Sequence, residues 1–302
     1  MDRRVLVGTG AGLWELAGER SRAIDMLAGR TITAVAIDGD VAWALVDGAA
    51  LWQERNGAWA RCAAIAGPSA TSLAPAAGAV WIGTDQARLF RFRDGGLHGV
   101  ESFDRVDGRD TWYTPWGEPP QARSMAVARD GSVYVNVHVG GVARSNDDGK
   151  TWAPTLDIET DVHQVVAHPV RAEVVLVAAA AGFGVSRDAG RAWEFVTAGL
   201  HAHYLRAVAV AGDDVVISAS AGPHGRRAAL YRKPLDGGRF ARCREGLPTW
   251  FDDNVDTACL AADGARVVCG TQDGRIFRSL DGGGRWELAL KDLPAITGVA
   301  LG

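Results

Sequence analysis

Three histidines stand at the starts of successive strand-like stretches or in the short loops beside them: His138, His163 and His203. Neutral imidazoles bind zinc and similar ions, and three such ligands leave a fourth position open for water. We therefore predict that the three converge as metal ligands or acid–base groups, with a divalent metal ion as the cofactor. The alternative is that each imidazole bonds a backbone carbonyl, because no local ligand spacing marks the set.

Charged side chains also stand near the starts of the predicted innermost strands. A guanidinium can hold a carboxylate or phosphate through two parallel N–H bonds, so we predict that Arg123 clamps an anionic group. Asp256 joins Arg123, His163 and His203 as a candidate catalytic residue, since a carboxylate can carry out acid–base work. The alternative for Arg123, and for Arg206, is a salt bridge to Asp161 or Asp256.

Other polar and aromatic side chains form the predicted substrate-binding set. A tryptophan-rich segment can stack on a sugar or an aromatic ligand, or act as a lid, although it can equally pin a long loop in place. Aspartates in loops commonly cap turns instead of binding substrate. The predicted set is Trp112, Tyr113, Trp116, Asn136, Arg206, Trp250, Asp252 and Asp253.

The elements that must position these residues repeat along the chain. Strand-like units begin at intervals of 36 to 53 residues, near Val5, Val41, Val80, Val133, Val174, Val215 and Val267. That spacing is typical of a four-stranded propeller blade. An Ala- and Val-rich stretch, expected to be an innermost strand, precedes every unit except the first. We therefore predict an all-β, seven-bladed β-propeller of four-stranded blades over residues 1–302.

The first unit lacks its innermost strand, and the end of the chain supplies one. Residues 296–301, Ile-Thr-Gly-Val-Ala-Leu, match residues 32–37, Ile-Thr-Ala-Val-Ala-Ile, almost position for position. The C-terminal strand is therefore expected to complete blade one. Such closure pairs strand edges that would otherwise be open to association with other chains.

A Ser-x-Asp-x-Gly-x-x-Trp motif occurs three times, beginning at Ser145, Ser186 and Ser279. The Asp can accept backbone N–H bonds in a tight turn, the Gly supplies a positive φ, and the Trp covers the apolar side of the hairpin. The repeated motif resembles the BNR or Asp-box propeller superfamily, which includes sialidases, sortilin-type receptors and photosystem-assembly propellers. The resemblance implies the propeller fold, with the motifs on the periphery and outside any catalytic centre. A true sialidase is not expected, because the chain has no Phe-or-Tyr-Arg-Ile-Pro motif.

The motif hairpins fix one face of the predicted ring, so the inter-blade connections and second-to-third-strand loops belong to the opposite face. The three longest insertions, residues 101–121, 219–228 and 246–255, all belong to that opposite face. Polar residues at the starts of innermost strands are concentrated in blades four to seven. At the equivalent positions, blades one to three have Ile296, Ile32 and Thr71. A purely structural repeat has no reason for this asymmetry, so we place the site there.

Composition narrows the classes of partner. The chain is 47% hydrophobic and 23% charged, with a net charge of −4 and no basic stripe, so neither nucleic acid nor a membrane is an expected partner. No apolar stretch typical of a signal peptide follows the first residues, which favours a cytoplasmic protein. The four cysteines have no metal-type spacing and are expected to be core residues.

Together these features predict a metal-assisted hydrolase or lyase that acts on a small polar or sugar-like molecule. The competing hypothesis is a non-catalytic binding or assembly propeller that docks a protein partner. A carbohydrate-binding or glycosidase-like module is the third. A glycosidase would require two carboxyl groups about 5 to 9.5 Å apart, a distance that a sequence does not supply.

Overall fold

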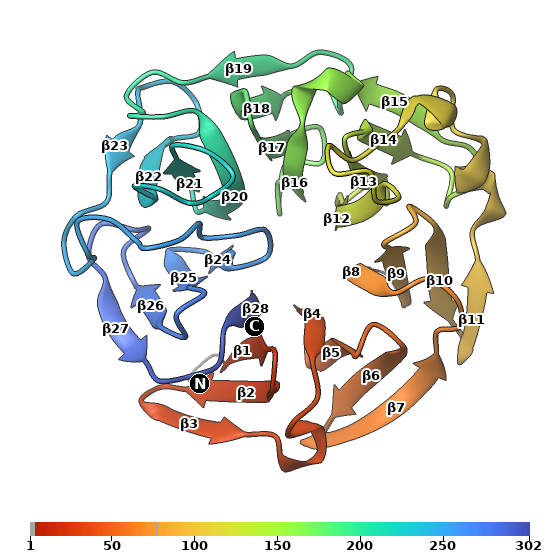
Figure 1. The fold of residues 1–302 in the computed structure, drawn as a ribbon, viewed down its shortest axis with the longest axis horizontal. Helices are drawn as coiled ribbons and strands as arrows, with labels where there is room; N and C mark the ends of the chain where they lie inside the picture. The colour runs from red at the N-terminus through yellow and green to blue at the C-terminus, as the bar shows by residue number, and fades with distance from the viewer. Residues whose placement is uncertain (1–3, 77) are drawn as a thin grey trace.

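The computed structural model describes residues 4–76 and 78–302. These residues form seven four-stranded antiparallel sheets arranged as blades in a ring (Figure 1). One strand of each blade faces the central axis and the fourth lies at the rim. The seven-bladed propeller predicted from the repeat is confirmed. Within the described residues, no helix is both long and apolar enough to cross a bilayer.

The strands of each blade are given from the axis outward. Blade one holds β28 (Ile296–Leu301), β1 (Arg4–Thr9), β2 (Gly12–Ala17) and β3 (Arg20–Ala23). Blade two holds β4 (Ile32–Asp38), β5 (Val41–Val46), β6 (Ala50–Arg55) and β7 (Ala58–Ala64). Blade three holds β8 (Ala70–Ala76), β9 (Ala79–Thr84), β10 (Leu89–Arg93) and β11 (Gly96–Gly99). Blade four holds β12 (Gln121–Val127), β13 (Val133–His138), β14 (Gly141–Ser145) and β15 (Ala153–Leu156).

The remaining blades follow the same order. Blade five holds β16 (Val162–Ala167), β17 (Val175–Ala179), β18 (Gly182–Ser186) and β19 (Glu194–Val196). Blade six holds β20 (Tyr204–Ala211), β21 (Asp214–Ser220), β22 (Ala229–Pro234) and β23 (Ala241–Arg242). Blade seven holds β24 (Leu260–Asp263), β25 (Arg266–Gly270), β26 (Ile276–Ser279) and β27 (Glu287–Leu290). Four short 3-10 helices lie in connections: η1 (Asp25–Leu27), η2 (Glu101–Arg105), η3 (Arg109–Thr111) and η4 (Ile158–Thr160).

Blade one is assembled from both ends of the chain. β28 pairs antiparallel with β1, in a register that runs from Val5 opposite Leu301 to Thr9 opposite Ile296. The two termini therefore lie in the same blade (Figure 1). This arrangement confirms the predicted closure, and it leaves the inner edge of β1 paired instead of open.

Apolar layers between neighbouring blades form the core. The second strands are covered on both faces, and all six residues of β9 are buried. Phe183 of blade five meets Phe240 of blade six edge-on, with ring centroids 5.6 Å apart. Small residues are needed where blades crowd together, since a Cβ atom on Gly83 would lie 2.7 Å from the Cβ of Ala122 in the next blade. This crowding explains the Ala- and Gly-rich composition of the sequence repeats.

Three hairpins between third and fourth strands carry the Ser-x-Asp-x-Gly-x-x-Trp motif. In blade four the Ser145 hydroxyl donates to Asp147 over 2.8 Å and accepts from the Gly149 N–H over 2.9 Å. The same carboxylate accepts the N–H groups of Lys150 and Thr151. Equivalent bonds occur in the hairpins that begin at Ser186 and Ser279. The motif is therefore a set of local bonds that closes each turn, as the sequence predicts.

The motif tryptophans reach further than expected. Trp152 lies edge-on to Trp81 of the preceding blade, 6.0 Å between centroids, and Trp193 donates its indole N–H to the Thr155 carbonyl of the preceding blade. Only Trp286 bonds within its own hairpin, to the Gly283 carbonyl. Trp286 reaches the preceding blade through its backbone instead, since its N–H donates to the Glu245 carbonyl over 2.9 Å, so all three tryptophans join adjacent blades.

Blade six closes its outer hairpin with a lysine instead of a Ser–Asp pair. The ammonium of Lys233, 4% exposed, donates to the carbonyls of Pro234, Leu235 and Gly237 at 2.8, 3.2 and 3.0 Å. Charged donors make stronger hydrogen bonds than neutral ones, so one side chain holds the whole turn.

Replacing Lys233 by Met should leave three carbonyls without this donor. We expect the free energy of unfolding to fall by roughly 2–3 kcal/mol, the usual cost of losing a buried charged hydrogen-bond partner. Urea denaturation would measure it. Lys150→Met is the matched control, because that lysine is exposed in the corresponding hairpin of blade four. An equal, small effect in both variants would show that Lys233 does not hold the turn.

Candidate functional site

The long insertions lie on the face opposite the motif hairpins, as predicted. Residues 100–120 connect blade three to blade four, residues 243–259 connect blade six to blade seven, and residues 221–228 link β21 to β22. Each departs from the end of the ring at which the innermost strands begin. This face is called the loop face below.

Two of the predicted histidines meet there, across the boundary between blades four and five. His138 is the last residue of β13, and His163 is the second residue of β16. Asp161 lies between them: its carboxylate oxygens are 3.2 Å from His138 Nε2 and 3.6 Å from His163 Nε2. One ligand atom from each of the three residues lies within 4.8 Å of the others. Asp161 reaches this place from a left-handed backbone conformation, φ 48°, at the end of η4.

Hydrogen bonding fixes the tautomer of His163. Its Nδ1 contacts the carbonyl of Leu205, and a carbonyl only accepts, so Nδ1 carries the proton. The lone pair of Nε2 therefore points toward Asp161. Nε2 of His163 is buried and has no hydrogen-bond partner, whereas the buried Oδ1 of Asp161 has Nε2 of His138 3.2 Å away. Burial lowers the pKa of His163, so the ring is neutral near pH 7.

These three residues fit a divalent metal. The lone pair of His163 Nε2 faces Oδ2 of Asp161 over 3.6 Å without a proton between them, and a cation there would offset their repulsion. In a tetrahedral zinc site with bonds of about 2.0 to 2.2 Å, the ligand atoms are roughly 3.3 to 3.6 Å apart. The separations of 3.2 Å to Oδ1 and 3.6 Å to Oδ2 are close to that range but involve different oxygens of Asp161, and one ligand atom from each residue lies within 4.8 Å of the others. Two imidazoles and a carboxylate are a ligand set that zinc accepts.

His203 does not join this group, contrary to the sequence prediction, and Asp161 takes the third place. β20 begins at Tyr204, whose ring centre lies 4.6 Å from that of His163. Neighbouring residues of an extended chain point in opposite directions, so His203 is directed away and is exposed. The Asp-x-His spacing of residues 161 and 163 is the signal that sequence reasoning missed; the left-handed conformation of Asp161, just before β16, brings its carboxylate to His163.

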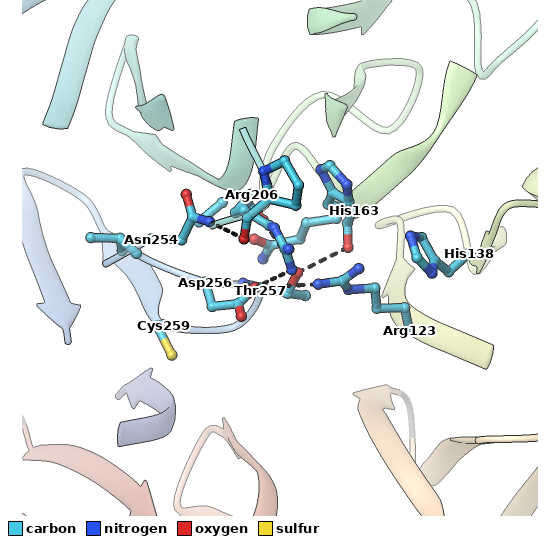
Figure 2. Close-up of polar contacts among 12 residues, drawn as sticks. Arg123, His138, His163, Arg206, Asn254, Asp256, Thr257 and Cys259 are labelled. Carbon is cyan, nitrogen blue, oxygen red and sulfur yellow. Dashed lines mark hydrogen bonds and ion pairs between the residues drawn. The ribbon is translucent and has the colours of Figure 1, made fainter. Parts of the chain in front are cut away.

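A second cluster stands beside the first. Arg123 of β12 and Arg206 of β20 both contact the same oxygen of Asp256, at 3.3 and 3.2 Å. Figure 2 shows the three side chains pointing toward one another, with His163 and His138 nearby. The salt bridge to Asp256 that was the alternative for both arginines is therefore present. The two guanidiniums share one carboxylate, which leaves a net positive charge.

The shared carboxylate is held in its ionised form. Burial opposes ionisation of Asp256, but the charges of Arg206 and Arg123 outweigh it, so the pKa of Asp256 lies below its ordinary value. The next residue ties this cluster to the histidines, because the Thr257 hydroxyl is 3.2 Å from the carbonyl of His163 and 3.3 Å from that of Arg206. The two clusters are thus parts of one bonded assembly on the loop face.

A cavity of about 400 Å³ follows the central axis below this assembly. Arg123, Gln164 and Thr257 are among its polar lining residues, and most of the rest of the lining is Ala, Val and Leu from the innermost strands. The cavity therefore has polar side chains at its loop-face end, where Arg123 and Thr257 lie.

The tryptophan-rich segment divides between two roles. Trp112 is buried against Phe103, with the guanidinium of Arg109 5.0 Å from its ring centre, so it pins the loop and offers no free face to a ligand. Trp116 is 59% exposed, and its ring centre lies 5.3 Å from that of His138. Tyr113 is also exposed. Of the predicted platform, Trp116 is the side chain placed over the histidine group.

The other predicted binding residues are dispersed. Asn136 is buried two residues from His138 on β13, and it donates to the carbonyl of Val162, which holds the start of β16. Asp252 is 90% exposed with Arg275 3.9 Å away, and Asp253 accepts the N–H of Asn254. Trp250 packs against Arg242, Arg227 and His201 of blade six. No contact links these last three residues to His163 or Arg123.

Comparison with known proteins supports the fold. No protein-family model and no curated protein sequence matches the chain. Among solved structures, a GH74 xyloglucanase from Xanthomonas campestris has a TM-score of 0.63 at 18% identity, covering 96% of this chain and 47% of its own. YCF48 from Cyanidioschyzon merolae has a TM-score of 0.66 at 14% identity, covering 99% and 90%. YCF48 bound to D1 peptide has a TM-score of 0.61 at 14% identity, covering 98% and 91%.

At these identities the likeness concerns the fold alone. This chain spans about half the length of the xyloglucanase. The fold of this chain is similar to the folds of the xyloglucanase and of YCF48.

Replacing Asp256 by Asn should destabilise the fold at neutral pH, because Arg123 and Arg206 would lose their only shared counter-charge. We expect a loss of roughly 1–3 kcal/mol, less than for a fully buried pair since Asp256 is partly exposed. The pKa of Asp256 is lowered by folding, so its contribution is present above about pH 4 and is lost at lower pH. Denaturation curves at pH 7, 5 and 3.5 would show the difference from wild type narrowing.

Asp252→Asn is the control for this experiment, because Asp252 lies in the same connection and is 90% exposed. Its stability should stay within about 0.5 kcal/mol of the wild type at every pH. A deficit in Asp256→Asn that does not change with pH would contradict the electrostatic explanation.

Proposed function

We propose that this chain is a metal-dependent hydrolase or lyase acting on a small polar molecule that carries a negative charge. His138, Asp161 and His163 hold the metal, for which zinc is the best match. The observation that carries the proposal is the convergence of His138, Asp161 and His163, which place one ligand atom each within 4.8 Å of the others, with the buried Nε2 of His163 lacking a hydrogen-bond partner. A buried lone pair without a partner is costly, and a cation bound by the three residues would satisfy it.

A bound zinc ion would lower the pKa of a coordinated water and polarise an oxygen of the substrate. The chain's own residues then have distinct tasks. Leu205 orients the His163 ring through its carbonyl, and Asn136 holds the strand that carries this ring. Trp116 covers His138 on the solvent side and restricts water there.

The anionic group of the substrate binds to the arginine pair. Arg123 lines the axial cavity and, with Arg206, has one positive charge in excess of Asp256. Asp256 was a candidate catalytic residue in the sequence analysis. Its lowered pKa and its two guanidinium partners suit it better to holding the arginines in position than to exchanging protons.

A non-catalytic propeller that docks a protein partner is the competing function. The observation that favours it is the similar fold of YCF48, one structure of which is bound to D1 peptide. The likeness to a xyloglucanase favours a glycosidase-like or carbohydrate-binding module in the same way. Neither likeness accounts for the convergence of His138, Asp161 and His163. The cytoplasmic location remains a prediction.

Metal binding should be measurable on the purified full-length chain. We expect one equivalent of Zn²⁺ to bind by isothermal titration calorimetry after dialysis against a chelator. Asp161→Asn and His163→Ala should each weaken binding at least tenfold, because each removes one ligand or its charge. His203→Ala should bind as the wild type does, since His203 lies outside the group.

Turnover separates the enzyme from the binding propeller. Small esters, lactones, phosphomonoesters and hydroxy acids with one negative charge should be assayed with zinc-loaded and chelator-treated protein. We expect activity on at least one class that disappears in His163→Ala. Wild-type zinc binding without turnover on any class, together with capture of a peptide, would favour the docking function instead.

A further inference from the structure

Blade six carries a second cationic cluster, on the side of the propeller away from the axis. The guanidinium of Arg242 lies 3.7 Å from the ring centre of Trp250, and that of Arg227 lies 5.0 Å from the same ring. Arg242 belongs to the outermost strand β23, Arg227 to the loop between β21 and β22, and Trp250 to the connection that follows β23. Three separate segments therefore bring two positive charges to one indole.

The cluster has no counter-charge. Among the residues that the structure describes, neither Arg227 nor Arg242 has an ion pair or a side-chain hydrogen bond, and Nε of Arg242 is buried without an acceptor. Burial and the charges of Arg244 and Arg227 lower the pKa of Arg242, and no carboxylate offsets them. In contrast, Arg123 and Arg206, on the innermost strands β12 and β20, share Asp256.

The surrounding contacts hold the two arginines in place. His201 stacks on Tyr231, 13° from parallel, and its Nδ1 is 2.8 Å from the Tyr231 hydroxyl. Tyr231 lies opposite Arg242 in the β22–β23 pairing. The Phe251 N–H bonds the carbonyl of Ala228, which ties the Trp250 segment to the Arg227 loop. Arg227 itself has a left-handed backbone, φ 57°.

We propose that this cluster, Arg227, Arg242 and Trp250, binds a phosphate group, free or as a monoester. Guanidinium groups present several N–H donors in a fixed plane that suits the oxygens of a phosphate, and a dianion matches two unpaired positive charges. The indole face holds the Arg242 plane in position through a cation–π contact, so less order has to be gained on binding. The site lies apart from the His138–Asp161–His163 group and does not depend on the proposed enzyme activity.

Fluorine NMR on the full chain labelled with 5-fluorotryptophan gives a local test. Replacement of Trp250 and Trp116 by Phe, one at a time, assigns their two signals among the eleven tryptophans. On titration with inorganic phosphate at constant ionic strength, we expect the Trp250 signal to shift and saturate. Trp116, beside His138, reports separately on any phosphate that binds near the histidine group.

Arg242→Gln and Arg227→Gln should each weaken the Trp250 titration at least tenfold. Arg226→Gln is the matched control, because Arg226 is an exposed neighbour in the same loop outside the cluster, and it should titrate as the wild type does. Arg242→Lys, which keeps the charge but not the planar group, should be intermediate. Circular dichroism of each variant shows that the blade is intact.

A second titration with phosphoserine distinguishes the two sources of the group. Tighter binding than inorganic phosphate assigns a phosphomonoester, and equal or weaker binding assigns the free ion. The proposal is overturned if the Trp250 signal does not saturate with either probe, or if folded Arg242→Gln titrates as the wild type does. His163→Ala should leave this titration unchanged, so failure here is distinct from failure of the metal site.

Discussion

Packing of each blade against its two neighbours is the constraint on which this structure depends. The second strand of each blade is covered on both faces, and no blade can bury its apolar side chains alone. The ring must therefore close, and β28 closes it by pairing with β1. In the closed ring every innermost strand begins at the same end. The long connections therefore gather on one face. The candidate site is a result of this geometry, since its residues come from blades that are distant in sequence.

Polar groups on the loop face are organised as a connected set. Thr257 links the backbone of His163 to that of Arg206, while Asp256, the residue before it, holds both arginines. Displacement of the connection that carries Asp256 and Thr257 would therefore disturb the arginine pair and the strand that carries His163 together. The blade-six cluster is different, because its arginines pack against an indole and, among the described residues, form no ion pair.

The fold was predictable from sequence because a similar strand pattern recurs seven times along the chain. Blade number, the C-terminal closure and the face of the long insertions all follow from the spacing and from the match between residues 296–301 and 32–37. The site was predictable only in part. His138 and His163 were expected to meet and do, but side-chain direction at a strand start depends on register. A shift of one residue there puts Tyr204, not His203, against His163.

Other features were outside the reach of sequence patterns. The buried position of Trp112 depends on how η2 and η3 fold the long connection back onto blade four, and a composition rich in aromatic residues suits both a lid and an anchor. The use of Lys233 to close a hairpin follows from three carbonyls that happen to converge on its ammonium. Neither leaves a recurring motif, because each occurs once in the ring.

The position of the His138–Asp161–His163 group has a mechanical consequence. His138 belongs to blade four, whereas Asp161 and His163 belong to the start of blade five, so the three side chains face one another across a seam that no β-sheet hydrogen bonds span. An ion held there would add a further link between two sheets that side-chain bonds, such as that from Asn136 to the Val162 carbonyl, already join. Metal occupancy of this site and the rigidity of blades four and five relative to each other would then be coupled. The same three side chains would serve both the chemistry and the stability of the ring.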